Sequence, residues 1–492
     1  MTGFLQKSAA FALALLTLLS CAACAGETGP VTTPSSESTT VSPTTDPPAF
    51  VSSGKTYDGQ SFIILMSGFA PETFNDFTYA EEEQSVLDNA VYQKNLACEE
   101  LYDIKIETVN DFGPSTGGYS KMKQQKTAGS LGYHLSFIAG YDVANLGYTG
   151  VLYDLASIDT LDLKKDWWDQ NANAENAVNG NLFYTTGDIS IWDDLQQFAV
   201  GFNKQIIEEQ GHQTQELYGA VREGKFTYEM IYDFVKDYSG DVDGNETMDM
   251  KDRYGILTWD DSIYGVFSST GSKMVEADKS TGELTLAISG NETIFNTLTR
   301  YTEIIAETGI NYQRYESGGD LAALMFTENR AMFFFGRISS FQNFRDMNTN
   351  YGILPYPKAS ESQDRYYTIN SAYHMNYLCT LALDEDIEMR GEITDALAWL
   401  SQKHLTPAYH TKTLVGQLVR DDESLEMLEL LAANRIYDFG YILQPGKINA
   451  QLILTFREMG TGYASSIARY KAMAERELKK VNEEFAEQAK LW

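Results

Sequence analysis

The 492-residue sequence contains only four cysteines, Cys21, Cys24, Cys98 and Cys379. A small domain stapled by disulfides needs more cysteines, and a zinc site needs Cys or His pairs at close spacing, so neither is expected. Cys98 and Cys379 lie in the apolar stretches NLACEEL and NYLCTLAL, where a cysteine usually packs as a small hydrophobic side chain. A disulfide between them stays open, because spacing alone does not show pairing.

Proline is also scarce, and five of the eleven prolines fall within residues 28–48. Sixteen of the twenty-one residues in that stretch are Ser, Thr or Pro, so it has little apolar surface to bury and is expected to remain extended. This composition is typical of a stalk that holds a globular body away from a membrane. The body, from about residue 52 onward, is expected to be rich in regular structure.

Basic residues are outnumbered, with 37 Lys and Arg against 69 Asp and Glu, which gives a formal net charge of −32. Phosphate groups repel such a chain, so nucleic acid and anionic lipid headgroups are excluded as partners. The charge itself is typical of solubility at a cell surface.

A long apolar run occurs only near the N-terminus, where residues 8–19 follow a segment with one positive charge. About a dozen apolar residues suit a signal-peptide core and are too few to span a bilayer. Leu18-Leu19-Ser20-Cys21 resembles the bacterial lipobox, with small residues before the cut and a thiol after it. We therefore expect residues 1–20 to be a signal peptide and Cys21 to carry the lipid, within a stalk over residues 21–51. Cys24 is the alternative, but Cys21 stands where its lipobox needs an aliphatic residue.

The sequence has no GxSxG, P-loop, HExxH or GxGxxG motif, so we expect a protein that is not an enzyme. Asp193 and Asp194 beside Trp192 could suggest a glycosidase pair. Neighbouring residues on a strand point to opposite faces, however, whereas a glycosidase needs two carboxylates across a cleft. A surface glycoside hydrolase or other carbohydrate-active enzyme that pairs Asp193 with a distant acid remains the alternative.

The first part of the body alternates predicted strands over residues 61–66, 104–109 and 134–139 with helices over 88–103 and 121–127. This order predicts an α/β fold with a parallel sheet, in which ligands bind beyond the carboxyl ends of the strands. The middle, about 165–320, mixes helices with short strands. An apolar strand over 326–338 ends at Gly336-Arg337, and an apolar stripe predicts a long final helix. Some 440 residues are too many for one core and suggest two domains.

An acidic loop has the oxygen spacing of an EF-hand. Side-chain oxygens fall at loop positions 1, 3, 5, 9 and 12, with a carbonyl at position 7, which predicts a structural calcium ion and no catalytic cofactor. Glu246 at position 6, where glycine is usual, and an aspartate at position 12 depart from the pattern, and an acidic solvated turn is the alternative. The expected ligands are Asp241, Asp243, Asn245, Thr247, Asp249 and Asp252.

Aromatic residues are abundant, with 30 Tyr, 25 Phe and 6 Trp, and many lie in polar, loop-like surroundings. Aromatic rings stack on the apolar face of a pyranose while carboxylates and amides bind its hydroxyl groups. This combination favours sugar binding.

Six phrases together resemble the extracellular solute-binding lipoproteins of bacterial ABC importers, in particular the carbohydrate-type, family 1-like branch. They are LDNAVYQKNLACEELYDIKI, YTTGDIS, FNKQIIEEQG, DVDGNETMDMKDRYGI, FTENRAMFFFGR and YGILPYPK, and the likeness spans about residues 56–460. It implies a two-lobed periplasmic-binding-protein-like fold (type II) with a hinge between the lobes and a helical C-terminal extension. Lobe 1 would contain residues 52–165 and 320–350, and lobe 2 residues 166–319 and 351–492.

The resemblance also implies a function. A monomer, lipid-anchored on the outer face of the cell membrane, would bind a mono- or oligosaccharide between its lobes and pass it to the transmembrane subunits of an ABC permease. A surface adhesin or a sensor protein is a further alternative. The side chains expected to bind the ligand are Phe69, Tyr141, Asp142, Trp192, Asp193, Arg337 and Tyr373.

Overall fold

The computed structural model describes residues 50–69, 77, 85–113, 117–278, 280–311, 320–345, 347–411 and 418–488. The expected signal peptide, Cys21, Cys24 and nearly all of the expected stalk lie outside these residues. By their contacts the described residues belong to one unit.

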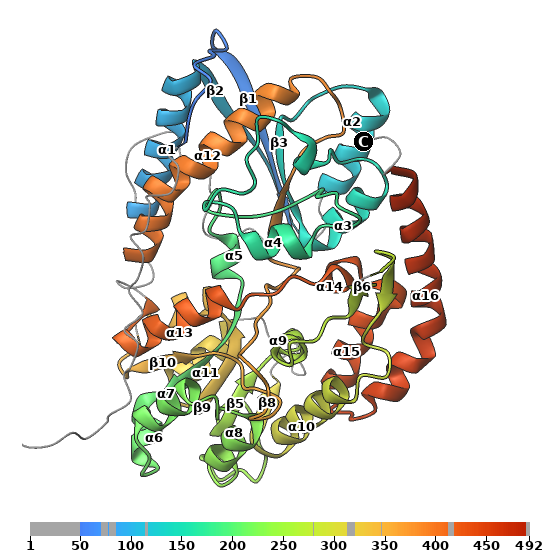
Figure 1. Ribbon diagram of the computed structural model, residues 1–492. Helices are drawn as coiled ribbons and strands as arrows, with labels where there is room; N and C mark the ends of the chain where they lie inside the picture. Colours follow the sequence, from blue (N-terminus) through green and yellow to red (C-terminus); the bar gives the residue numbers. More distant parts are fainter. Residues whose placement is uncertain are drawn as a thin grey trace, which may run out of the picture. The chain divides into compact units, whose positions relative to one another are not determined.

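A four-stranded sheet in the order β11-β3-β1-β2 forms the first part of this unit (Figure 1). Its first three strands in sequence run parallel, as the strand–helix–strand order predicted, and β11 pairs antiparallel with β3. The strands are β1 (Gln60–Gly68), β2 (Ile104–Phe112), β3 (Leu135–Ala139) and β11 (Asn376–Cys379). The helices that pack with this sheet or with one another beside it are α1 (Val86–Tyr102), α2 (Gly118–Ala128), α3 (Gly140–Tyr148) and α12 (Ile387–Ala408).

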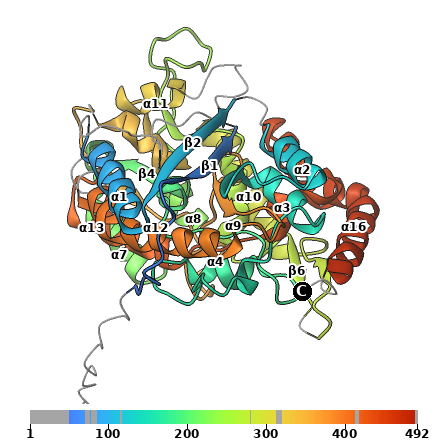
Figure 2. The same ribbon diagram turned by 90° about the horizontal axis from the view of Figure 1, so that it is seen from above.

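Local sequence explains where α1 begins and ends. The Ser85 side chain accepts a hydrogen bond from the backbone N–H of Asp88 at 3.1 Å, which satisfies one of the free donors of the first turn. Asp103 ends the helix in a left-handed conformation. One face buries Val91, Cys98 and Tyr102, and α1 lies side by side with α12 (Figure 2).

A five-stranded sheet in the order β10-β4-β9-β5-β8 forms the second part. Its strands are β4 (Phe198–Asn203), β5 (Tyr254–Thr258), β8 (Gly309–Asn311), β9 (Ala331–Arg337) and β10 (Tyr351–Leu354). The helices on this side are α6 (Lys204–Glu209), α7 (Thr214–Arg222), α8 (Tyr228–Val235), α9 (Ser262–Ser269), α10 (Glu292–Thr308), α11 (Asp320–Thr327), α13 (Asp422–Ala433) and α15 (Ile448–Arg457).

The uninterrupted apolar run of β9 follows from burial of both faces. The ring of Phe335 contacts Tyr356 at a centroid distance of 5.0 Å, and its neighbour Phe334 contacts Phe344 on the other face, also at 5.0 Å. A strand covered on both sides needs no polar residues at alternate positions, so it shows no alternation in the sequence.

The sheet membership of β9 corrects the predicted lobe boundaries. β9 pairs with β4 and β5, so residues 331–337 belong to the second sheet and do not return to the first. The segment that returns is β11, which pairs Cys379 with Ser136, followed by α12 against α1. The prediction failed because an apolar strand fits either sheet, and pairing over more than 200 residues leaves no local signal.

Three linking segments lie between the two sheets: residues 196–198, 368–371 and 434–436. Backbone hydrogen bonds join them: Ser371 N donates to Gln196 O at 2.9 Å, Phe198 N to Ile369 O at 3.2 Å, and Ile436 N to Thr368 O at 2.8 Å. The two segments that lead from one sheet to the other are thus held side by side, and residues 434–436, which follow α13, are bonded to the second of them.

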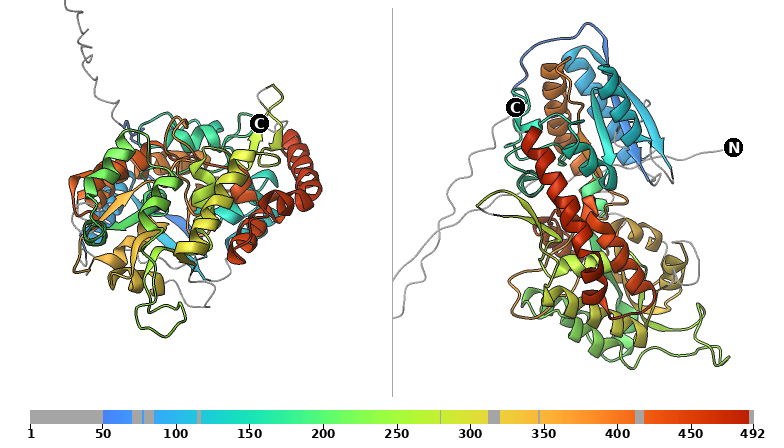
Figure 3. Two further views of the ribbon diagram at one scale, coloured as in Figure 1. Left: turned by 90° about the horizontal axis from the view of Figure 1, so that it is seen from below. Right: turned by 90° about the vertical axis from the view of Figure 1, so that its right-hand side faces the viewer.

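The final helix α16 (Tyr463–Gln488) packs on α3 beside the first sheet and on α10 and α15 beside the second (Figure 3). Its apolar stripe is buried as predicted, and Phe485 stacks on Phe183 at 5.8 Å. The other described helices are α4 (Gln170–Glu175), α5 (Trp192–Leu195), α14 (Phe439–Leu443) and the 3-10 turns η1 (Leu155–Ser157), η3 (Ile338–Phe344) and η5 (Pro445–Lys447), beside a hairpin of β6 (Val275–Ala277) and β7 (Leu284–Leu286).

Two features bear on the sequence expectations. The search for helices long and apolar enough to cross a membrane, made over the described ranges, found none. Cys98 and Cys379 are both buried and carry free thiols, so the disulfide left open by the sequence is not formed.

Candidate functional site

Side chains that follow the strand ends of both sheets meet the linking segments in one group, here called the strand-end cluster. It includes five of the seven side chains expected to bind ligand. The members are Phe69, Phe112, Tyr141, Trp192, Gln196, Trp259, Arg337, Tyr373 and Asn376.

Arg337 connects the second sheet to the first linking segment. It ends β9, and its Nη1 donates a hydrogen bond to Gln196 Oε1 at 2.6 Å. Its guanidinium also lies over the indole of Trp259, 5.2 Å from the ring centroid. The sequence singled out this arginine because it follows an apolar strand, and the structure places its charge at the strand end.

Trp192 and Asn376 line the side of the first sheet. The indole of Trp192 is nearly parallel to the ring of Phe112, with centroids 6.5 Å apart. Gly68 allows Asn376 and Phe112 to approach the end of β1, because a Cβ there would lie 2.9 Å from Asn376 Oδ1 and 3.2 Å from Phe112 Cδ1.

Several buried polar atoms of the cluster have no hydrogen-bonding partner among the described residues. They are Trp192 Nε1, Gln196 Nε2, and both amide atoms of Asn376, on side chains that are at most 2% exposed. A buried donor or acceptor without a partner costs roughly 1–3 kcal/mol. Trp192 and Gln196 are four residues apart on one helical turn, so their side chains share a face. A polar molecule bound beside that face would satisfy these groups.

Phe69 and Tyr373, two further members of the cluster, form a stacked aromatic pair with ring centroids 5.0 Å apart. The next residue, His374, shares a hydrogen bond of 3.0 Å between Nδ1 and Ser371 Oγ. Burial, and then the nearby guanidinium of Arg337, lower the pKa of His374 well below its usual range. The imidazole is therefore neutral at physiological pH.

Tyr141 contacts the ring of Phe69 and lies next to two further tyrosines. Its ring contacts that of Tyr441 at 6.3 Å, and Tyr441 contacts Tyr264 at 4.7 Å. Burial raises the pKa of all three tyrosines, and the negative charge of Asp261 adds to the shift. Burial raises the pKa of Asp261 to about 6, Arg337 opposes the shift, and Asp260 adds to it.

The two remaining expected ligand-binding residues have other surroundings. Asp142 is half-buried in the first turn of α3, where the helix dipole favours a carboxylate. Asp193 is only 5% exposed, and its carboxylate forms an ion pair of 2.7 Å with Arg435. Burial raises the pKa of Asp193, and the guanidinium of Arg435 opposes the shift. Asp193 is thus committed to a protein contact.

The same network bears on the glycosidase alternative. Arg435 also pairs with Asp194 at 2.6 Å and with Asp169 at 3.1 Å, so one guanidinium holds all three carboxylates. A nucleophile or general acid must reach a glycosidic bond across a cleft. These carboxylates are turned to a buried arginine instead, and the arrangement does not support catalysis by Asp193.

Gln196, Asn376, Tyr264 and Tyr441 were missed by the sequence analysis. Glutamine and asparagine occur throughout the chain, and nothing local marks the two that become buried between the sheets. Asn376 directly precedes the apolar run YLCTLAL, and a strand prediction there would have placed it at a sheet edge. Tyr264 and Tyr441 are brought to Tyr141 by contacts distant in sequence.

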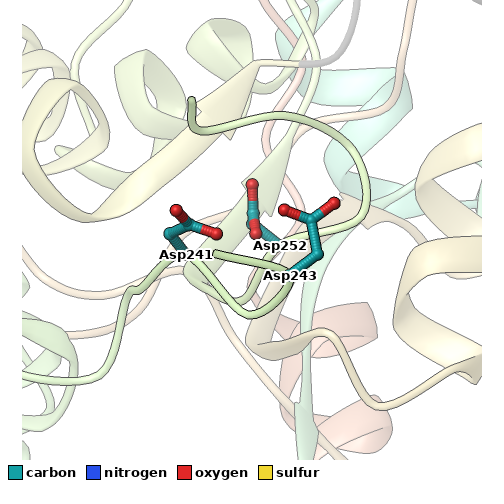
Figure 4. A group of neighbouring side chains, drawn as sticks. All are labelled: Asp241, Asp243 and Asp252. Carbon is teal, nitrogen blue, oxygen red and sulfur yellow. The ribbon is translucent and has the colours of Figure 1, made fainter. Parts of the chain in front are cut away.

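The acidic loop brings together three of its six expected metal ligands. One carboxylate oxygen each from Asp241, Asp243 and Asp252 lies within 4.8 Å of the others, as Figure 4 shows. Asp252 accepts hydrogen bonds from the N–H groups of Asp249 and Val242, which lower its pKa. Three carboxylates form the oxygen-rich donor set that a hard cation prefers.

The other three expected ligands differ in their contacts. The carboxylate of Asp249 accepts from Lys251 N at 2.8 Å, and the amide oxygen of Asn245 accepts from Thr247 N at 2.7 Å. Glu246 at position 6 has a φ of 63°, the left-handed conformation that glycine usually supplies at this position. The loop therefore takes an EF-hand-like path despite the departures in its sequence.

No family model and no curated protein matches the sequence. Solved structures do match over most of the chain. A family 1 extracellular solute-binding protein from Bifidobacterium longum subsp. infantis has a TM-score of 0.55 at 12% identity, covering 87% of this chain and 99% of that one. A cyclo/maltodextrin-binding protein in complex with maltotetraose has a TM-score of 0.53 at 12% identity, covering 87% and 97%.

A solute-binding protein of an ABC transporter from Thermotoga lettingae, bound to α-D-tagatose, has a TM-score of 0.51 at 15% identity and covers 86% and 100%. At such identities the likeness establishes the fold. The chain has the two-lobed α/β fold of these solute-binding proteins, as the sequence predicted.

Proposed function

We propose that this protein binds a neutral carbohydrate at the strand-end cluster and delivers it to the permease of an ABC importer. The observation that carries the proposal is the set of buried, unpartnered polar atoms on Trp192, Gln196 and Asn376, beside aromatic rings. Sugar hydroxyl groups both donate and accept, so one sugar can satisfy the indole N–H and both amides. The rings of Phe112 and Trp192 offer the apolar faces on which a pyranose packs.

Charge favours a neutral ligand over an acidic one. The cation of the cluster, Arg337, lies near the carboxylate of Asp261, and His374 is neutral because its pKa is lowered. Asp260 pairs with Arg457 in the same region. With these charges matched and the chain at −32, an anionic sugar gains no net attraction.

The fold neighbours support the same ligand class, since the two sugar complexes above hold maltotetraose and α-D-tagatose. The linking segments supply the hinge that such a protein needs. Closure about them would enclose a ligand between Arg337 and Trp259 on one side and Phe69 and Phe112 on the other.

Export and anchoring complete the proposal. The N-terminal apolar run and lipobox-like residues support a lipid on Cys21, which would hold the protein, as a monomer, on the outer face of the membrane that contains the permease. Catalysis is not part of this function, because the suggested carboxylate pair is held by Arg435.

We propose in addition that the acidic loop binds calcium in a structural role. The support is the group formed by Asp241, Asp243 and Asp252 and the EF-hand-like path of the loop. The loop leads into β5, so an ion there would stabilise the second sheet without contacting the ligand.

Titration calorimetry with neutral mono- and oligosaccharides tests the ligand class. We expect the wild type to bind an unchanged sugar saturably. The Kd should rise about tenfold or more for Gln196→Ala and for Trp192→Phe, which keeps a ring but removes the N–H. Gln205→Ala is the matched control, because Gln205 lies on the exposed side of α6. Hydrolysis of the sugar by the wild type would contradict the proposal, as would binding that neither variant weakens.

A further inference from the structure

Three tyrosines close the strand-end cluster on the side of α3. Tyr141 belongs to α3 beside the first sheet, Tyr264 to α9 beside the second, and Tyr441 to α14, which lies between them (Figure 1). We call Tyr141, Tyr264 and Tyr441 the tyrosine wall. It spans the space between the two sheets with side chains of the protein itself.

Two of the three tyrosines are hydrogen-bonded to the backbone. The hydroxyl group of Tyr264 donates to the carbonyl of Asn449 at 3.2 Å, and that of Tyr441 accepts from the backbone N–H of Ala372 at 3.1 Å. The ring of Tyr141 contacts Tyr441, which in turn contacts Tyr264. Tyr264 and Tyr441 are at most 2% exposed, so they are fixed in place behind Tyr141.

This satisfaction contrasts with the other side of the cluster. Trp192, Gln196 and Asn376 hold buried polar atoms without partners, whereas the wall has no such atom among its hydroxyl groups. A polar ligand gains most where protein groups lack partners. To continue past Tyr141 it would have to displace the buried side chains of Tyr264 and Tyr441 from their hydrogen bonds to the backbone. The wall therefore bounds the site, with Tyr141 at its edge and Tyr264 and Tyr441 behind it.

The geometry points to a site that the tyrosine wall closes at one end, here called the blind end, so that a carbohydrate must bind there with the end of its chain. A polymer cannot continue past Tyr141, because Tyr441 and Tyr264 occupy the space beyond. This inference rests on the proposed function and adds to it that the protein recognises a terminal sugar and excludes internal segments of a chain. Tyr141, singled out in the sequence as a ligand contact, then acts as the stop.

The test uses the full-length protein and linear malto-, cello-, xylo- and manno-oligosaccharides of two to six units. Each oligosaccharide that binds is compared with two derivatives, which carry a bulky aromatic group on the reducing or on the non-reducing end. We expect the wild type to lose about tenfold or more in affinity for at least one derivative, since the group would have to enter the wall.

Truncation of a tyrosine of the wall should restore the affinity for the derivative that the wild type binds weakly, called the blocked derivative. In Tyr141→Ala the blocked derivative should bind within about threefold of the free oligosaccharide, and Tyr264→Ala should do the same from the opposite side. Tyr141→Phe keeps the ring and should retain the discrimination. Tyr148→Ala is the matched control, a tyrosine on the same helix that packs against Phe485 outside the wall, and it should behave as the wild type.

The outcomes separate the two proposals. If the wild type binds neither a member of the panel nor any neutral sugar of the titration above, the proposed function is wrong. If it binds monosaccharides alone, only the inference about a chain end is wrong. If the wild type binds both derivatives as well as the free sugar, or if neither alanine variant, shown to be folded by circular dichroism, restores the blocked one, only the blind end is wrong.

Discussion

The guanidinium of Arg435 donates to the carboxylate of Asp193 at 2.7 Å and joins the third linking segment to α5 through a buried ion pair. Arg435 lies in the third linking segment, and Asp193 precedes the first. Asp169 and Asp194 share the same guanidinium, and Arg435 is only 4% exposed. The contact stabilises the part of the chain that lies between the two sheets.

Removal of this arginine should be costly. Arg435→Met leaves three carboxylates near one another without their cation, and breaking a buried pair in this way costs about 3–5 kcal/mol. We expect the free energy of unfolding, measured in urea, to fall by this amount. The control is Arg222→Met, which breaks the exposed pair with Glu426 and should cost less than about 1 kcal/mol. Equal losses in the two variants would show that the buried network does not stabilise the linking segments.

Asp395 should give the stability a distinctive pH dependence. One of its oxygens accepts from the indole N–H groups of Trp167 at 2.8 Å and Trp168 at 2.9 Å, and burial raises its pKa to about 6. Between about pH 4 and pH 6 the native carboxyl keeps a proton that the unfolded chain has lost. This group therefore lowers the stability as pH rises through that window, and its contribution is complete below it.

Asp395→Asn keeps an acceptor oxygen but does not titrate. The stability of the wild type minus that of the variant should fall by about 3 kcal/mol between pH 4 and pH 7, since one pKa unit corresponds to about 1.4 kcal/mol. Urea unfolding at each pH measures the difference. Asp278→Asn is the control, because hydrogen bonds lower the pKa of the exposed Asp278 to about 2, so its difference changes with the opposite sign at lower pH. A flat difference for Asp395 would contradict the prediction.

The backbone of the acidic loop offers a stabilising substitution. Glu246 has a φ of 63°, and an L-residue in this conformation costs about 1 kcal/mol relative to glycine. We expect Glu246→Gly to raise the thermal midpoint, because glycine adopts this conformation without strain and is usual at this position. Gly244, at a φ of 73° in the same loop, allows the opposite substitution, from glycine to an L-residue. Gly244→Ala should lower the midpoint although nothing lies near the added methyl group.

Calcium binding has its own test. Addition of calcium should raise the thermal midpoint of the wild type, and a chelator should reverse the change, because binding to the native state alone stabilises it. Asp243→Asn should lose most of the calcium-dependent rise, since it removes one charge from the group with Asp241 and Asp252. Asp278→Asn, in the turn between β6 and β7, should keep it. If neither calcium nor chelator changes the thermal midpoint, the loop is a solvated turn that binds no calcium.

Local signals in the sequence predicted much of the fold and less of the site. The run SFIILM, the alternation of IKIETV and the stripe ending at Phe485 correctly predicted β1, β2 and α16, because their periods reflect burial that neighbours in sequence share. The return of β11 to the first sheet depends on pairing with Ser136, for which the chain carries no local pattern.

The same distinction holds within the site. Arg337 and Trp192 were found because a charge after an apolar strand, or a tryptophan among polar residues, is unusual in itself. Asp193 was predicted to bind the ligand, but its partner Arg435 is some 240 residues away, and that contact decides its role. Gln196 becomes a candidate only when its burial and its unpartnered amide are seen.

The membrane anchor is a prediction on residues outside those that the structure describes. Cys21→Ala removes the thiol of the lipobox-like sequence, so the protein should appear in the culture medium or the soluble fraction instead of the membrane. Cys24→Ala is the matched control and should remain with the membrane, since Cys24 lacks an aliphatic residue three positions upstream. Metabolic labelling with a fatty acid, followed by fractionation, measures both. Retention of the Cys21 variant and release of the Cys24 variant would assign the lipid to Cys24. Retention of both variants would show that neither cysteine alone holds the protein at the membrane.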